Sequence, residues 1–114
     1  MPKAPEYAAA VVAEALAGGL VIALFYGAEE VAYTGYQRIN TTPDQWQQTD
    51  ARAENSTLIR FPASAHDSDT PADSVHLYAS DGSPLYLLPL PAELIIRNND
   101  APVFDPADIA FEES

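Results

Sequence analysis

The chain has 114 residues, which fits one domain, so we interpret residues 1–114 as a single unit. Its 47% hydrophobic and 10% aromatic content is typical of a globular protein and excludes a disordered tail. The absence of cysteine excludes disulfides, thiol nucleophiles and cysteine-based zinc sites. Seventeen acidic against five basic residues give a net charge of −12, which repels phosphate and therefore argues against binding to nucleic acid or to an anionic membrane.

The chain begins with features of a short amphipathic helix over about residues 5–18. Pro5 fits the first helical position, and Glu6 suits the positive end of the helix dipole. Gly18 and Gly19 then supply a left-handed stop. The apolar face is formed by Tyr7, Val11, Val12 and Leu16. A helix this short is marginal alone, so we expect it to dock on the following strand.

We predict neither a signal peptide nor a membrane span in this region. Glu14 interrupts the apolar run, and the charge-free residues 15–26 are shorter than the roughly twenty that a span requires. Tyr26 would also occupy the −3 place of a cleavage site before Ala28, where a small residue is needed.

The rest of the chain reads as short strands separated by turn signals. Residues 20–26 are apolar without alternation, which predicts a central strand covered on both faces, whereas the polar residues 42–56 predict a loop. Asp81-Gly82 marks a hairpin, and Pro89 and Pro91 predict a sheet edge or a bulge. The other expected strands are residues 31–41 (a weaker candidate), 57–61, 74–79, 85–88, 93–97, 103–104 and 108–111. The fold class is therefore mainly β: a small antiparallel β-sandwich or barrel with one short N-terminal α-helix.

Residues that carry chemistry are few. His66 and His76 have no serine or acid at a spacing that indicates a triad, so we predict no catalytic residues and no cofactor. Asp67, Asp69 and Asp73 share one loop and are weak candidates for a calcium site, although the spacing departs from an EF-hand. We expect them to be solvated turn acids and the protein not to be an enzyme.

Trp46 is the single tryptophan and stands in the polar stretch 42–56. It either covers the rim of the core or acts as an interface anchor, a role in which tryptophan is enriched. If it is an anchor, the substitution Trp46→Ala should weaken binding to a partner and leave the isolated fold intact.

Several short motifs follow one another in an order that resembles a known family. After the helix and the strand ending in Tyr26, Glu30-Val31 precedes Thr34-Gly-Tyr-Gln-Arg38, and Asn55-Ser-Thr-Leu-Ile-Arg-Phe-Pro62 follows. Ser74-Val-His-Leu-Tyr78 and Asp81-Gly82 come next, and Asn99-Asp100-Ala-Pro-Val-Phe104 is last. This series resembles the short virion structural proteins of tailed phages, which include capsid decoration or cement proteins and are often labelled tail-fibre proteins. The resemblance covers nearly the whole chain, although Ala28-Glu29 replaces the family's Gly-Thr.

The resemblance implies a non-enzymatic protein on the outer surface of the virion, made in the host cytoplasm, whose partner is the major capsid protein. Such a protein would bind the assembled lattice as a homo-oligomer, a trimer or dimer, with Tyr33, Tyr36 and Trp46 as candidate interface anchors. A tail or fibre-base location, with neighbouring tail proteins as partners, remains an alternative. A small carbohydrate- or cation-binding β module is a second one.

Overall fold

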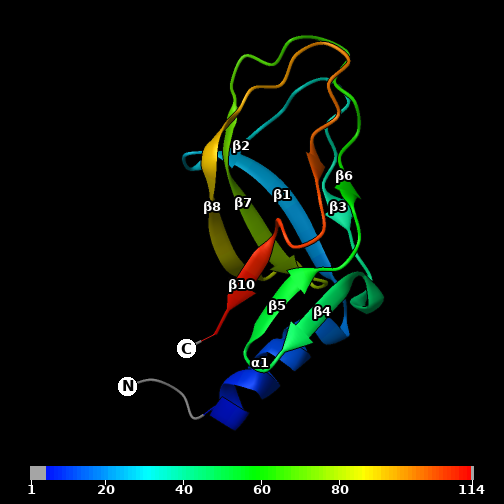
Figure 1. Cartoon of the computed structure of the whole chain (residues 1–114). Helices are drawn as coiled ribbons and strands as arrows, with labels where there is room; N and C mark the ends of the chain where they lie inside the picture. Colours follow the sequence, from blue (N-terminus) through cyan, green and yellow to red (C-terminus); the bar gives the residue numbers. More distant parts are fainter. Residues whose placement is uncertain (1–4, 114) are drawn as a thin grey trace.

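The computed structural model describes residues 5–113, which form one helix and a set of antiparallel strands (Figure 1). In chain order the elements are α1 (Pro5–Ala17), β1 (Leu20–Tyr26), β2 (Glu29–Glu30), β3 (Ile39–Asn40), the short 3₁₀ helix η1 (Pro43–Gln45), β4 (Trp46–Thr49), β5 (Arg52–Asn55), β6 (Ile59–Arg60), β7 (Ala72–Ala79), β8 (Pro84–Leu94), β9 (Val103–Phe104) and β10 (Ala110–Glu112). The predicted mainly β class with one N-terminal helix is thus confirmed.

The largest sheet is built around β1, which is flanked by β2 and β3 on one side and by β7 on the other. β8 pairs with β7 and forms the edge of this sheet. Leu20, Ile22 and Leu24 of β1 are completely buried, as expected for a central strand without alternation. On β7 the alternation also holds, because Val75 and Leu77 enter the core.

Helix α1 ends where Gly19 adopts a positive φ of 78°, and a Cβ at this position would lie 2.1 Å from the Thr41 carbonyl oxygen. Its buried stripe consists of Ala8, Val12 and Leu16, whereas Tyr7 is 58% exposed. The helix packs against β4 and β5 (Figure 1). The prediction that it covers β1 was wrong, because a second sheet supplies its docking surface.

The prediction of a loop over residues 42–56 was also wrong. β4 and β5 form a hairpin in which Thr49 pairs with Arg52, and Asp50 in the turn has a positive φ of 55°, a conformation that aspartate tolerates. The inward face of the hairpin carries Trp46, Gln48, Ala53 and Asn55. Two amides on that face give it the composition of a loop, although both side chains make hydrogen bonds inside the fold.

The second layer of the molecule consists of two small sheets. β5 lies between β4 and β10, and β6 pairs with β9. The core lies between these sheets and the inner face of the β1-containing sheet, and its largest fully buried side chains are Phe61, Leu20, Ile22, Leu24, Ile59, Leu77, Ile96, Ile109, Val12 and Val75. The expected strand over residues 93–97 does not form as such, because β8 ends at Leu94.

The irregular pairing of β8 with β7 explains why the two layers of strands stay open along one side. Ala72 of β7 pairs with Leu94, whereas Ser74 pairs with Pro89, so two steps along β7 face five steps along β8. This bulge displaces residues 90–93, and Pro89 and Pro91 have no N–H with which to extend the ladder. No closed barrel forms among the strands of residues 5–113, and the prediction that the prolines mark an edge or bulge is confirmed.

Candidate functional site

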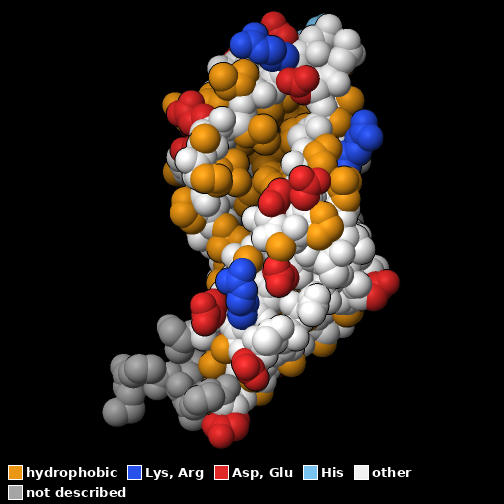
Figure 2. All heavy atoms as spheres, in the orientation of Figure 1, with side chains coloured by type: hydrophobic (Ala, Val, Ile, Leu, Met, Phe, Trp, Pro, Cys, Tyr) orange, Lys and Arg blue, Asp and Glu red, His pale blue; other side chains and the backbone are white. Residues whose placement is uncertain are grey.

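An apolar groove lies where the bulged part of β8 faces β9 without pairing to it. Two adjoining hollows, with volumes of about 360 and 220 Å³, share Leu90, Pro91 and Asp108 as lining residues. Their remaining walls come from Val75 of β7, from β8, from β9 and from residues 108–110. Figure 2 shows this region as a depression with apolar side chains on its floor and walls. We call it the β8–β9 groove.

The β8–β9 groove lies directly over the hydrophobic core. Phe104 and Ile109 at its base are 7% and 2% exposed, so they pack as core residues, while Val103 on its wall is 43% exposed. Leu90 and Leu94 are half-buried against the same core cluster. A partner that covered Val103, Leu90 and Leu94 would extend the core of the domain. Continuous apolar surface of this kind distinguishes a binding surface from scattered exposed leucines.

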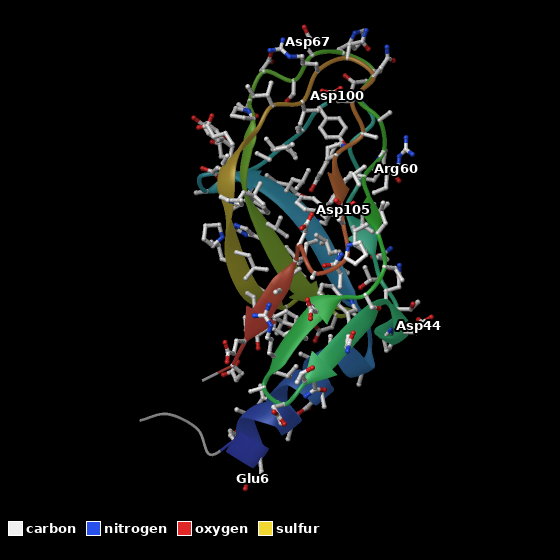
Figure 3. The ribbon with its side chains drawn as sticks, viewed as in Figure 1. Glu6, Asp44, Arg60, Asp67, Asp100 and Asp105 are labelled. Atoms are coloured by element: carbon white, nitrogen blue, oxygen red, sulfur yellow. The ribbon has the colours of Figure 1, made fainter. Side chains whose placement is uncertain are left out.

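Acidic side chains surround the groove. Glu93 and Asp108 line it, and Asp105 lies beside it on the segment between β9 and β10 (Figure 3). The Asp108 carboxylate accepts a hydrogen bond of 2.8 Å from the Asp105 backbone N–H, which fixes the turn. Among residues 5–113, no lysine or arginine lines either hollow.

Asn55 holds the wall of the groove to the second layer. Its amide nitrogen donates to the carbonyl oxygens of Thr57 and Asp105, both at 2.9 Å, and its Oδ1 accepts from the Ile109 N–H at 2.9 Å. Its own carbonyl oxygen accepts from the N–H of Ala107, a residue with a positive φ of 74°. The wall is therefore fixed by a buried side chain and does not depend on a flexible loop.

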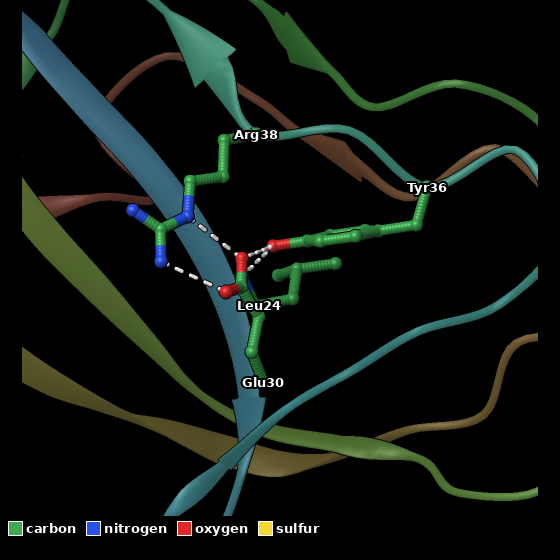
Figure 4. Close-up of polar contacts among 4 residues, drawn as sticks. All are labelled: Leu24, Glu30, Tyr36 and Arg38. Atoms are coloured by element: carbon green, nitrogen blue, oxygen red, sulfur yellow. Dashed lines mark hydrogen bonds and ion pairs between the residues drawn. The ribbon is translucent and has the colours of Figure 1, made fainter.

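A second polar feature, the Glu30 cluster, is formed beside β1 by Glu30 of β2 with Tyr36 and Arg38 (Figure 4). Arg38 donates to both oxygens of Glu30 at 2.8 Å, and Tyr36 donates to Glu30 Oε2 at 2.6 Å. The Tyr36 hydroxyl also accepts from the Leu24 N–H at 3.1 Å. Hydrogen bonding to Arg38 lowers the pKa of Glu30, and burial raises the pKa of Tyr36. These contacts hold residues 30–38 against β1.

His76 lies beside the Glu30 cluster. Its ring stacks on Phe25 with centroids 3.6 Å apart and an interplanar angle of 3°. Its Nε2 is buried and has no hydrogen-bond partner among the described residues. Burial lowers the pKa of His76, an effect that the nearby Glu30 and Asp73 oppose and Arg38 reinforces.

The lowered pKa values of His76 and Glu30 predict that the fold loses stability in acid. The pKa of His76 is lower in the folded chain than its ordinary 6.5, so the unfolded chain binds the proton more tightly and stability falls as the pH drops below 6.5. The lowered pKa of Glu30 stabilises the fold above 4.5, and this contribution is lost as the pH falls further. Urea denaturation across this range should show two successive losses. His76→Gln should remove the upper one and His66→Gln, at an exposed position, should not; an unchanged profile in His76→Gln would refute the assignment.

The residues predicted as interface anchors pack in or against the core. Trp46 and Tyr33 are each only 6% exposed. The Tyr33 hydroxyl donates to the Pro62 carbonyl oxygen at 2.6 Å, and the Tyr36 ring packs between Tyr33 and Phe61. The anchor interpretation is therefore corrected for Trp46 and Tyr33, whose side chains have little surface left to offer a partner, while Tyr36 is only partly buried.

Of the candidate calcium ligands, Asp67 and Asp69 line one hollow, but Asp73 does not join them. Asp67 accepts a hydrogen bond from the Asn98 N–H at 2.8 Å, and Asp73 accepts one from the Gly27 N–H at 3.1 Å on a different part of the molecule. Among the described residues, no three histidine, aspartate or glutamate side chains gather as metal ligands, so this candidate site is corrected as well. Helix α1, with 13 residues, is too short to span a membrane, and residues 5–113 contain no longer helix.

The sequence pattern marks only one side of the β8–β9 groove. The prolines at positions 89 and 91 interrupt an alternating run of leucines, and this pattern predicted an edge. What the sequence did not reveal is that β9, Val103–Phe104, would lie opposite this edge. Comparison with known protein families, characterised proteins and solved structures finds no match for this chain.

Proposed function

We propose that this protein is a non-enzymatic structural module that binds another protein through the β8–β9 groove. The observation that carries the proposal is the open groove itself, in which Val103 and the half-buried Leu90 and Leu94 stay accessible between β8 and β9. Contiguous apolar surface of this kind marks interaction sites in proteins. Glu30, Tyr36 and Asn55, which lie outside the groove, are used in hydrogen bonds that hold the fold, which favours a structural role over a catalytic one.

The resemblance to short tailed-phage virion proteins extends this proposal to a particle. We assign the module to the outer surface of the virion as a capsid decoration or cement protein, with the major capsid protein as its partner and a trimer or dimer as its assembly state. A protein that binds the assembled lattice and not its free subunits stabilises the lattice by mass action. The net charge of −12 is compatible with an outward position, because it disfavours adhesion to the packaged DNA.

Purified particles provide the test. We expect quantitative mass spectrometry to find this chain in many copies distributed with the major capsid protein, and removal of the chain to lower the temperature at which the capsid opens. A few copies that purify with tails would instead support the tail or fibre-base alternative. Absence of the chain from purified particles would refute the virion assignment.

A further inference from the structure

We infer that the β8–β9 groove receives an extended segment of the partner protein, in which apolar side chains lie next to at least one lysine or arginine. This inference rests on the proposed function, because it describes the partner of the same groove. It follows from the shape of the groove, from the chemistry of β8 and from the distribution of charge around both hollows.

The shape favours a segment of chain over a compact ligand. The two hollows adjoin along Leu90 and Pro91. Figure 2 shows this region as a depression that opens to solvent. A segment lying along them would place one apolar side chain against Leu94 and Phe104, and another against Val75 and Ile109. Recognition by several anchors spaced along a chain is typical of peptide grooves.

The edge of β8 determines how the segment is held. A peptide that joins a sheet edge gains affinity from continuous backbone hydrogen bonds. Pro89 and Pro91 have no N–H, and the bulge between Pro89 and Leu94 interrupts the ladder. Side-chain burial must therefore supply most of the binding energy, and the prolines protect the edge against indiscriminate strand addition.

Charge determines which segment fits. Glu93 and Asp108 line the groove and Asp105 lies beside it, with no lysine or arginine among the lining residues. A lysine or arginine on the partner would meet these carboxylates at the rim, while an acidic segment would be repelled. A second copy of this chain is a poor occupant, since each copy carries a net charge of −12.

The test places a photoreactive benzoylphenylalanine at one of two exposed apolar positions of the full chain, expressed with its particle. Val103 is 43% exposed on the groove wall, and Leu87 is 60% exposed on the outer face of the sheet, opposite His76. We expect Val103 to cross-link to an extended partner segment that contains apolar residues and a lysine or arginine. Leu87, the matched control, should not reach that segment.

The charge requirement is tested in the same assay. The double variant E93Q/D108N removes two charges at the groove and keeps the hydrogen-bond acceptor at position 108. It should lower the Val103 cross-link yield about fivefold, in line with a few tenths to one kcal/mol for each rim ion pair. The control E14Q/D69N makes the same charge change at exposed positions outside the groove and should leave the yield unchanged.

Other outcomes overturn the inference. A Val103 cross-link to a second copy of the chain would make the groove a self-interface. A segment without lysine or arginine, or an equal loss in both double variants, would refute the charge requirement. If the chain copurifies with particles but Val103 gives no cross-link, the groove assignment fails and the virion assignment stands; if the chain is absent from particles, it is the virion assignment that fails.

Discussion

Replacing Trp46 with alanine is expected to destabilise the isolated domain by about 3–5 kcal/mol, the usual cost of removing a large aromatic side chain from a core. The indole packs edge-on against Phe111, with ring centroids 5.9 Å apart, and its Nε1 donates to Thr41 Oγ1 at 2.7 Å. The same hydroxyl donates to the Leu20 carbonyl oxygen and accepts from the Leu20 N–H. The hydrogen and both lone pairs of the Thr41 hydroxyl are thus used, and Trp46 donates one of these three hydrogen bonds.

The measurement is urea denaturation followed by circular dichroism, because Trp46 is the single tryptophan and its removal eliminates the fluorescence signal. Leu87→Ala is the matched control: it also removes a large apolar side chain, but one that is 60% exposed, and it should change stability by less than about 1 kcal/mol. A Trp46→Ala domain as stable as the unchanged protein would contradict the core assignment and restore the interface-anchor interpretation.

Where one face of a strand was clearly apolar, its position could be predicted from the sequence. Ile59 and Phe61 are each 1% exposed, whereas Leu58 between the hairpin and this strand is 51% exposed, as the alternation of residues 57–61 indicated. Such patterns are local, since successive side chains of a strand point to opposite faces. The Asp81-Gly82 turn was also predictable, because Gly82 adopts a positive φ of 92° that few residues accept.

The predictions were wrong for segments whose burial depends on tertiary contacts and not on a local sequence pattern. Trp46 and Asn55 face each other across the β4–β5 pair and are both buried, yet Trp46 is followed by glutamines and Asn55 is polar. Their burial depends on partners at Thr41 and Asp105, which no local pattern shows. Because residues 42–56 were predicted to form a loop, the packing of α1 against this hairpin could not be predicted either.

The β8–β9 groove illustrates the same limit for the candidate site. Pro89 and Pro91 predicted that β8 lies at an edge, which is half of the site. The other half depends on β9 and on the turn between Asp105 and Asp108, and both are positioned by contacts with β6 and Asn55. Site residues that act through shape and exposure have no signature in the sequence until their neighbours are known.

Asn55 is buried in the core, and its side chain holds the wall of the β8–β9 groove. We therefore expect its substitution to have the second large effect on stability. Its amide nitrogen uses both hydrogens, one on the Thr57 carbonyl oxygen and one on the Asp105 carbonyl oxygen, and the residue is only 1% exposed. Aspartate has nearly the same shape but no hydrogens to donate. Asn55→Asp would therefore leave two carbonyl groups without donors and place a negative charge against them.

We expect Asn55→Asp to cost about 3–5 kcal/mol at neutral pH, from two lost hydrogen bonds and one buried charge. The exposed control Asn40→Asp makes the same chemical change on β3 and should stay within about 0.5 kcal/mol. The pH dependence identifies the cause, because the introduced carboxylate has a raised pKa in the folded state. As the pH falls through that pKa, protonation removes the buried charge, and the stability gap to the unchanged protein should narrow. A gap that stays constant in urea denaturation as the solution is acidified would show that the loss arises from packing and not from the charge facing the carbonyl groups.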